Sequence, residues 1–292
     1  MESRDGSLSL KSRLKVAYYA YAQNRFARLA LATITIGAAI ASGGRPTLLV
    51  ETLLALLLLD MYLGRAVRNR EPLAGFGFPS TGALKGFVVG AIAAAAVITT
   101  TVVIFAIAGW YEVESFELDL IGFSYYTALF LGVSVAEEVL SRGMIWRFVE
   151  RRAGTLLALV VSSLFFGLGH FLNPGATLWS GLAIALHAGG LLGAMFIATR
   201  SLWVPIGGHF AWNLFEGPIL GTEVSGLDTD VLIEATTRGP EIWTGGAFGP
   251  EASVITVVLG VVPALVLLAY AWKRGKFRSR EVTTSPVPSE PG

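Results

Sequence analysis

The chain has 292 residues, of which 53% are hydrophobic and 15% are charged, and its mean hydropathy is +0.63. A water-soluble fold could not bury that much apolar surface, so the composition indicates a membrane protein. The net charge of only +1 gives no sign of a nucleic-acid partner, and the absence of cysteine excludes disulfides, thiolate metal sites and cysteine nucleophiles.

Apolar segments long enough to cross a bilayer recur along the chain. A helix needs roughly 20 residues to cross about 30 Å of hydrocarbon. Segments close to that length are 26–42, 46–64, 86–110, 121–140, 154–172, 178–198, 202–220 and 252–272. They predict an all-α, polytopic membrane protein with about eight transmembrane helices.

The domain organisation follows from these spans. We expect a cytoplasmic segment over residues 1–25, a transmembrane helical domain over 26–272, and a disordered cytoplasmic tail over 273–292. Residues 39–42 resemble a signal-peptide cleavage site, which leaves removal of the first span as an alternative. The polar lead of 25 residues is, however, long for a signal peptide.

Charged residues alternate between the loops in step with the spans. Basic residues precede the first span, follow the second, fourth and sixth, and follow the eighth. The opposite loops carry the acidic residues Glu112, Glu114, Glu117, Asp119, Glu223, Asp228, Asp230, Glu234 and Glu241. The positive-inside rule therefore predicts that both termini are cytoplasmic, in a protein of the cell membrane.

Ionisable side chains within three spans are candidates for a functional site, because charge is expensive inside a bilayer. The candidates, with one carboxamide, are Glu137, Glu138 and Arg142 in the fourth span, His170 in the fifth, and His209 and Asn213 in the seventh. Three of the six are therefore grouped within six residues of the fourth span, and the other three come from elsewhere in the sequence.

Helical spacing assigns different positions to these side chains. Glu138 and Arg142 are four residues apart, which favours an ion pair, whereas Glu137 is rotated about 100° away and stays available. His209 and Asn213 are also four residues apart and share one face of their helix. The remaining imidazole, His187 in the sixth span, is expected to be a packed or hydrogen-bonded helix residue.

Counting from a turn near Ala153 places two of the candidates at one level. Glu137 lies 16 residues before that position and His170 lies 17 after it. At 1.5 Å per residue, both are about 25 Å from the turn of a tight antiparallel hairpin. The sequence therefore predicts that the carboxylate and the imidazole meet.

Two mechanisms fit this set of residues. In the first, Glu137 and His170 activate a water for attack on a peptide carbonyl, while His209 and Asn213 donate hydrogen bonds to the developing oxyanion. In the second, a zinc ion bound by His170, His209 and Glu137 lowers the pKa of the water. Asn213 favours the first, because asparagine is a poor zinc ligand, so no cofactor is expected.

The ordered motifs resemble those of the CPBP family of intramembrane peptidases, which includes CAAX prenyl proteases and bacteriocin-processing or immunity (Abi-like) proteins. The patterns are EExxxR from Glu137 to Arg142, FxxxH from Phe166 to His170, and HxxxN from His209 to Asn213. The resemblance covers about residues 78–215, the expected peptidase core.

The resemblance implies an eight-helix fold whose site opens toward the cytoplasm. It also implies water activation by Glu137 with His170, an oxyanion site at His209 and Asn213, and supporting positions at Glu138 and Arg142. We therefore predict an intramembrane endopeptidase, a hydrolase that acts on membrane-associated peptides or proteins. The alternatives are a non-catalytic immunity or scaffold protein that binds a peptide in the same cavity, the zinc-dependent peptidase, and a proton-coupled transporter, although no repeat typical of transporters is visible.

Overall fold

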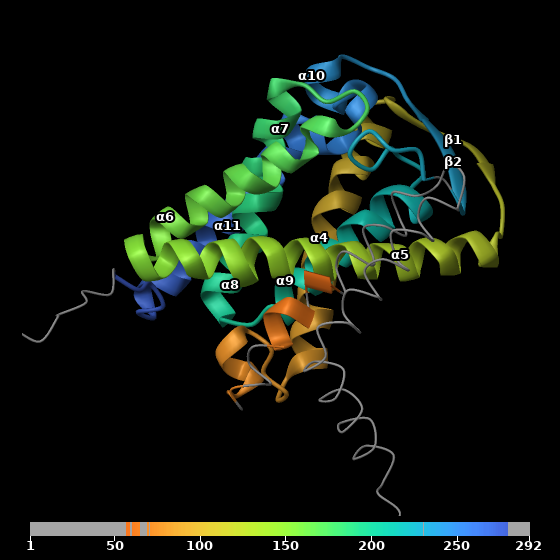
Figure 1. The fold of residues 1–292 in the computed structure, drawn as a ribbon. Coiled ribbons are helices and arrows are strands. Elements are labelled where there is room, and N and C mark those ends of the chain that lie inside the picture. The colour runs from red at the N-terminus through yellow and green to blue at the C-terminus, as the bar shows by residue number, and fades with distance from the viewer. Residues whose placement is uncertain (1–56, 59, 65–68, 70, 230, 280–292) are drawn as a thin grey trace, which may run out of the picture.

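The computed structural model describes residues 57–58, 60–64, 69, 71–229 and 231–279 (Figure 1). The first predicted span, most of the second, the N-terminal segment and the chain from residue 280 onward lie outside the described residues. Within the described part, four helical stretches are long and apolar enough to cross a membrane: Ala83–Ile107, Leu120–Leu172, Leu178–Thr199 and Val254–Lys273. The protein is therefore a predominantly helical membrane protein, as predicted.

The helices follow one another closely along the chain. They are α4 (Ala83–Ile107), α5 (Leu120–Glu138), α6 (Trp146–Gly169), α7 (Leu178–Ile184), α8 (Gly190–Thr199), α9 (Trp203–Leu214), α10 (Glu241–Thr244) and α11 (Val254–Lys273). Short 3₁₀ segments are Leu73–Phe76, His170–Leu172, Gly246–Phe248 and Pro250–Ala252. Three π-helical segments complete the helical path: Val139–Ile145 between α5 and α6, Ala185–Gly189 between α7 and α8, and Phe215–Ile219 after α9.

The fourth and fifth predicted spans form one continuous helical path with a sharp break. The helix does not end at residue 140 but continues until Gly154, whose φ of 82° and ψ of 173° are not helical. Such a positive φ is readily adopted only by glycine. The helical path therefore breaks at this glycine, and Figure 1 shows the chain changing direction between α5 and the far end of α6.

The stretch formed by α7 and α8 is the centre of the bundle. Of its apolar window, 78% is buried, against 28% for α4 and 22% for α11. The exposed faces of these two outer helices carry large apolar side chains, including Val89 and Ile92 on α4 and Val262 and Val266 on α11. Such faces are typical of helices in contact with lipid.

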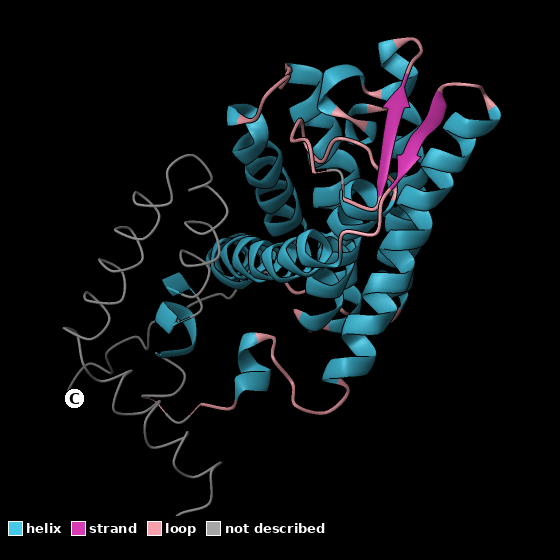
Figure 2. Ribbon diagram, turned by 90° about the vertical axis from the view of Figure 1, so that its right-hand side faces the viewer, coloured by secondary structure: helices cyan, strands magenta, loops and turns pink. Residues whose placement is uncertain are grey.

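Two strands add a small β-ribbon to a fold that was predicted to be all-α. Strand β1 (Tyr111–Phe116) pairs antiparallel with β2 (Ile233–Thr237), at one end of the helical bundle (Figure 2). The ribbon joins two of the loops that the sequence marks as acidic. The all-α membrane fold is supported, and in this ribbon two loops far apart in sequence satisfy each other's backbone groups.

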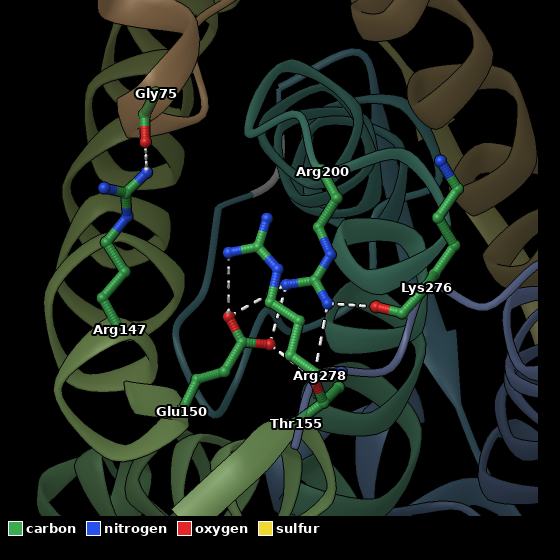
Figure 3. A network of polar contacts seen from close by, with 7 residues as sticks. All are labelled: Gly75, Arg147, Glu150, Thr155, Arg200, Lys276 and Arg278. Atoms are coloured by element: carbon green, nitrogen blue, oxygen red, sulfur yellow. Dashed lines mark hydrogen bonds and ion pairs between the residues drawn. The ribbon is translucent and has the colours of Figure 1, made fainter. Parts of the chain in front are cut away.

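A network of basic residues joins loops elsewhere on the molecule (Figure 3). Arg200, at the end of α8, donates to both carboxylate oxygens of Glu150, at 2.7 and 3.0 Å, and also to the carbonyl oxygen of Lys276. Thr155 bonds to Glu150 and to the backbone nitrogen of Arg278. The three loops joined here are all among those that the charge pattern assigned to the cytoplasm.

The start of the predicted disordered tail is ordered. Lys273 is the last residue of α11, and the backbone of Arg278 exchanges two hydrogen bonds with Thr155, at 2.8 and 3.0 Å. The chain is therefore folded against the network through Arg278. The physical reason is that backbone groups of this segment find partners at Thr155, beside the Gly154 turn.

The contact between α4 and α9 depends on glycine. A Cβ atom at Gly207 of α9 would lie 2.0 Å from the carbonyl oxygen of Phe87, and one at Gly90 of α4 would lie 1.9 Å from that of Val204. Small residues that let helix backbones approach are a common feature of membrane helix packing. Helix α9, which carries two candidate site residues, is thus held directly against α4.

Replacement of Gly207 by alanine tests this contact. We expect Gly207→Ala to destabilise the protein by about 1–3 kcal/mol, because the added methyl group forces α4 and α9 apart. The measurement is the thermal unfolding midpoint in detergent. The matched control is Gly190→Ala, where no atom lies within 4 Å of the new Cβ; equal midpoints for the two variants would contradict the contact.

Candidate active site

The four principal candidates of the sequence line one cavity. Its volume is about 320 Å³, within the range of small-ligand sites, and Glu137, His170, His209 and Asn213 all border it. They come from α5, from the 3₁₀ turn after α6, and from α9. The structure therefore brings together side chains that lie up to 76 residues apart in the sequence.

The predicted ion pair between Glu138 and Arg142 is present. An Nη1 of Arg142 lies 2.6 Å from Oε1 of Glu138, and both side chains are fully buried. Arg142 also donates to the carbonyl oxygen of Gly189 at 3.1 Å and lies over the ring of Phe166. These contacts connect α5 to the centre of the bundle and to α6.

Glu138 has a second partner that spacing alone did not indicate. Nδ1 of His209 lies 3.3 Å from the same Oε1 that accepts from Arg142. A histidine whose Nδ1 faces a carboxylate is fixed in orientation, and its Nε2 is left for another partner. Glu138 therefore positions His209 as well as pairing with Arg142.

The phenylalanine of the FxxxH motif separates the two imidazoles of the site. The ring of Phe166 is 5.5 Å from that of His209, edge to face, and 5.1 Å from that of His170. Its carbonyl oxygen lies 2.8 Å from Nδ1 of His170. In the neutral ring Nδ1 then carries the proton and Nε2 is the acceptor, as a group that receives a proton from water requires.

Glu137 differs from its neighbour in its surroundings. Its side chain is half-buried and borders the cavity, whereas Glu138 is fully buried in the ion pair. This is the division that the 100° rotation between successive residues predicted. Of the two adjacent carboxylates, Glu137 is therefore the one that a ligand in the cavity can meet.

π-Helical turns flank the candidate residues. Val139–Ile145 begins directly after the two glutamates, and Phe215–Ile219 begins two residues after Asn213. Wide turns of this kind are rare and occur frequently at functional sites. The third, Ala185–Gly189, contains His187, which stacks on Trp212 at 5.1 Å and bonds to the carbonyl oxygen of Glu251 at 3.0 Å.

His187 therefore has the geometry expected of a packed and hydrogen-bonded helix residue. It is completely buried and does not border the cavity.

One acidic residue of the cavity wall was not identified from the sequence. Glu251, in the 3₁₀ segment Pro250–Ala252, is 4% exposed and borders the same cavity. Burial raises the pKa of its carboxyl above the usual range, while His170 and a hydrogen bond from Ser225 oppose that rise. It lies in a loop outside every motif, so neither spacing nor membrane depth could have marked it.

Segments outside the long helices also border the cavity. They contribute Asn173, Val224, Ser225, Leu227 and Glu251, whereas Arg147, Glu150 and Arg200 of the basic network do not line it. The opening of the site toward the cytoplasm stays a prediction.

Among the described residues, no group of three or more His, Asp or Glu side chains is arranged to hold a metal ion. Nδ1 of His209 already faces Glu138. The zinc alternative remains a prediction, which the chelator comparison below tests.

Comparison with known proteins gives one match. Residues 119–215 match the model of the family described as type II CAAX prenyl endopeptidase Rce1-like. No curated protein and no solved structure shows a significant match. The matched range contains all three motifs, which confirms the resemblance drawn from them. This match supports a CPBP-family intramembrane peptidase over residues 119–215.

Proposed function

We propose that the protein is an intramembrane endopeptidase that hydrolyses a peptide bond of a membrane-associated peptide or protein. The observation that carries this proposal is the convergence of Glu137, His170, His209 and Asn213 on one cavity within a helical membrane domain. The family match supports peptidase chemistry in general.

Water activation is assigned to Glu137 and His170. Both border the cavity, and the contact of Nδ1 of His170 with the carbonyl oxygen of Phe166 leaves Nε2 as an acceptor. A water held between a carboxylate and such a nitrogen can lose a proton as its oxygen attacks the peptide carbonyl. The same proton can then be passed to the leaving nitrogen when the C–N bond breaks.

Stabilisation of the oxyanion is assigned to His209 and Asn213. The carboxamide of Asn213 is a neutral N–H donor on the cavity wall. For His209 to donate from Nε2 while its Nδ1 faces Glu138, the ring must be doubly protonated. Glu138 then supplies the balancing negative charge, which explains a buried carboxylate that contacts both Arg142 and His209.

We also propose a topology of eight spans with both termini in the cytoplasm of a cell-membrane protein. Two observations support it. The acidic loops meet in the β1–β2 ribbon, and the basic loops meet in the Arg200 network. The positive-inside rule assigns the basic loops to the cytoplasm.

Loss of turnover in single-site variants tests the water-activating pair. Purified protein is incubated with a library of tagged membrane peptides that includes prenylated tails and bacteriocin leaders. We expect Glu137→Gln and His170→Ala to lower kcat by at least about a hundredfold, because each removes a proton acceptor. Glu117→Gln, on the exposed loop after β1, is the charge-matched control.

Each other outcome of that experiment has a definite meaning. Cleavage that persists in Glu137→Gln contradicts the assignment of the base. Cleavage abolished by a chelator and restored by zinc supports the metal alternative. Peptide capture without cleavage by the wild type overturns the peptidase and supports the scaffold alternative.

Truncation of the carboxamide tests the oxyanion site. We expect Asn213→Ala to lower kcat by about 10²–10³ while KM stays within a factor of about three, because the donor acts only on charge that develops in the transition state. Steady-state kinetics on one cleaved peptide provide the measurement. A rise in KM of the same size with unchanged kcat would instead assign Asn213 to substrate binding.

The absence of cysteine makes the topology directly measurable. Ser115→Cys in the ribbon and Ala153→Cys beside the Gly154 turn each place one thiol at an exposed position. A membrane-impermeant maleimide is expected to label Ser115→Cys in intact cells and Ala153→Cys only after permeabilisation. The reverse pattern would overturn the cytoplasmic assignment of the termini.

A further inference from the structure

A second cavity lies at the basic network and is separate from the candidate active site. Its volume is about 330 Å³, and it shares no lining residue with the cavity that holds the motif residues. The charged residues that line it are Arg147, Glu150, Arg151, Arg200 and Arg278. This basic cavity therefore has four cations against one carboxylate among its described lining residues, and the proposed mechanism uses none of them.

The single carboxylate of the basic cavity is already engaged. Both oxygens of Glu150 accept from Nη1 of Arg200, at 2.7 and 3.0 Å, whereas the nearest guanidinium nitrogen of Arg278 is 4.0 Å away. Figure 3 shows Arg200 and Arg278 turned toward this carboxylate, while Arg147 points to Gly75 instead. Glu150 therefore neutralises Arg200 most directly and leaves most of the positive charge of the cavity uncompensated.

The two arginines of α6 that line the basic cavity have no carboxylate partner of their own. The guanidinium of Arg147 donates to the carbonyl oxygen of Gly75. It also lies over the rings of Tyr62 and Phe76, at 5.5 and 4.9 Å, so neutral groups fix its position. Arg151, four residues further along the helix, is exposed and forms no hydrogen bond or ion pair within the part of the chain that the structure describes. Like charges at this spacing repel, so an anion between them removes an unfavourable interaction.

The basic cavity lies where membrane helices end. Two of the apolar stretches that are long enough to span a bilayer end at Thr199 and Lys273, directly before the segments that contribute Arg200 and Arg278. Trp272, in the last turn of α11, is exposed. Exposed tryptophans at helix ends are typical of the membrane–water interface. The cavity is therefore at the level of lipid headgroups, where basic cavities between membrane helices bind anionic lipids.

The composition of the cavity indicates the chemistry of its ligand. All four of its cations are arginines, whose planar guanidinium groups match the oxygens of a phosphate in pairs of parallel hydrogen bonds. A phosphate has enough oxygens to accept from several guanidinium groups at once. The volume of the cavity is also within the range of small-ligand sites.

We propose that the basic cavity binds a phosphate-bearing anion through Arg147, Arg151 and Arg278, and that the headgroup of an anionic phospholipid supplies this anion. The acyl chains then lie along the exposed apolar surface of the neighbouring helices, which includes Phe148 on α6 and Val266 on α11. The proposal goes beyond the proposed function and does not depend on peptidase activity.

Calorimetric titration of the purified full chain in neutral detergent tests the proposal. The probes are short-chain phosphatidylglycerol, phosphatidylcholine with the same chains, and inorganic phosphate, all at one ionic strength because salt screens exposed charges. We expect phosphatidylglycerol to bind saturably at one site, and Arg151→Gln to weaken that binding about tenfold, since it removes a charge-assisted hydrogen-bond donor. The matched control is Arg152→Gln, which removes the same charge at the next position, where the guanidinium lies over Phe148 and outside the cavity. We expect the control to bind within a factor of about two of the wild type.

The remaining outcomes separate the cavity from surface charge and the lipid from the free ion. Without ligand, Arg151→Gln should keep the thermal unfolding midpoint of the wild type, because its side chain bonds to no described residue; Arg278→Gln is the second variant and should also weaken binding. Equal losses in Arg151→Gln and Arg152→Gln, equal binding of the two lipids, or no saturable binding would overturn the proposal. Inorganic phosphate that binds as tightly as phosphatidylglycerol would support the anion site but overturn the lipid as its source.

Discussion

The arrangement of the site depends on one buried charge interaction, that of Glu138 with Arg142. Both side chains are fully buried, and an unpaired charge in such surroundings costs several kcal/mol. Arg142 must therefore keep its contacts with Glu138 and with the carbonyl oxygen of Gly189, and the remaining acceptor capacity of Glu138 attracts His209. Through these contacts the positions of α5, α9 and the π-helical segment between α7 and α8 are set together, and with them the walls of the cavity.

The adjacent glutamates have separate tasks because of this pairing. If both carboxylates faced the cavity, their repulsion would favour protonation of one of them. Instead Glu138 is neutralised within its own helix, while Glu137 borders the cavity and can bind water. Phe166 contributes to the same separation, since its ring stands between His170 and His209 and also contacts the guanidinium of Arg142.

Helices and loops supply different parts of the cavity. The motif residues lie on helices or at a helix end, where neighbouring turns restrict each side chain. The loops bring Ser225, Asn173 and Glu251, which are held by contacts among themselves rather than by regular structure. Ser225 precedes β2 and Glu251 follows it, whereas Asn173 lies between α6 and α7, so this part of the cavity wall is assembled from separate segments of the chain.

The sequence by itself determined what depends on composition and on local spacing. Apolar content indicated a membrane protein; four-residue spacing predicted the Glu138–Arg142 pair, because such neighbours meet on any helix; and ordered motifs identified the family. Tertiary structure decided the contact of His209 with Glu138 across 71 residues, the entry of Glu251 into the cavity wall, and the pairing of two acidic loops in the β1–β2 ribbon. These depend on how helices and loops pack over long separations, for which no local pattern of residues carries a signal.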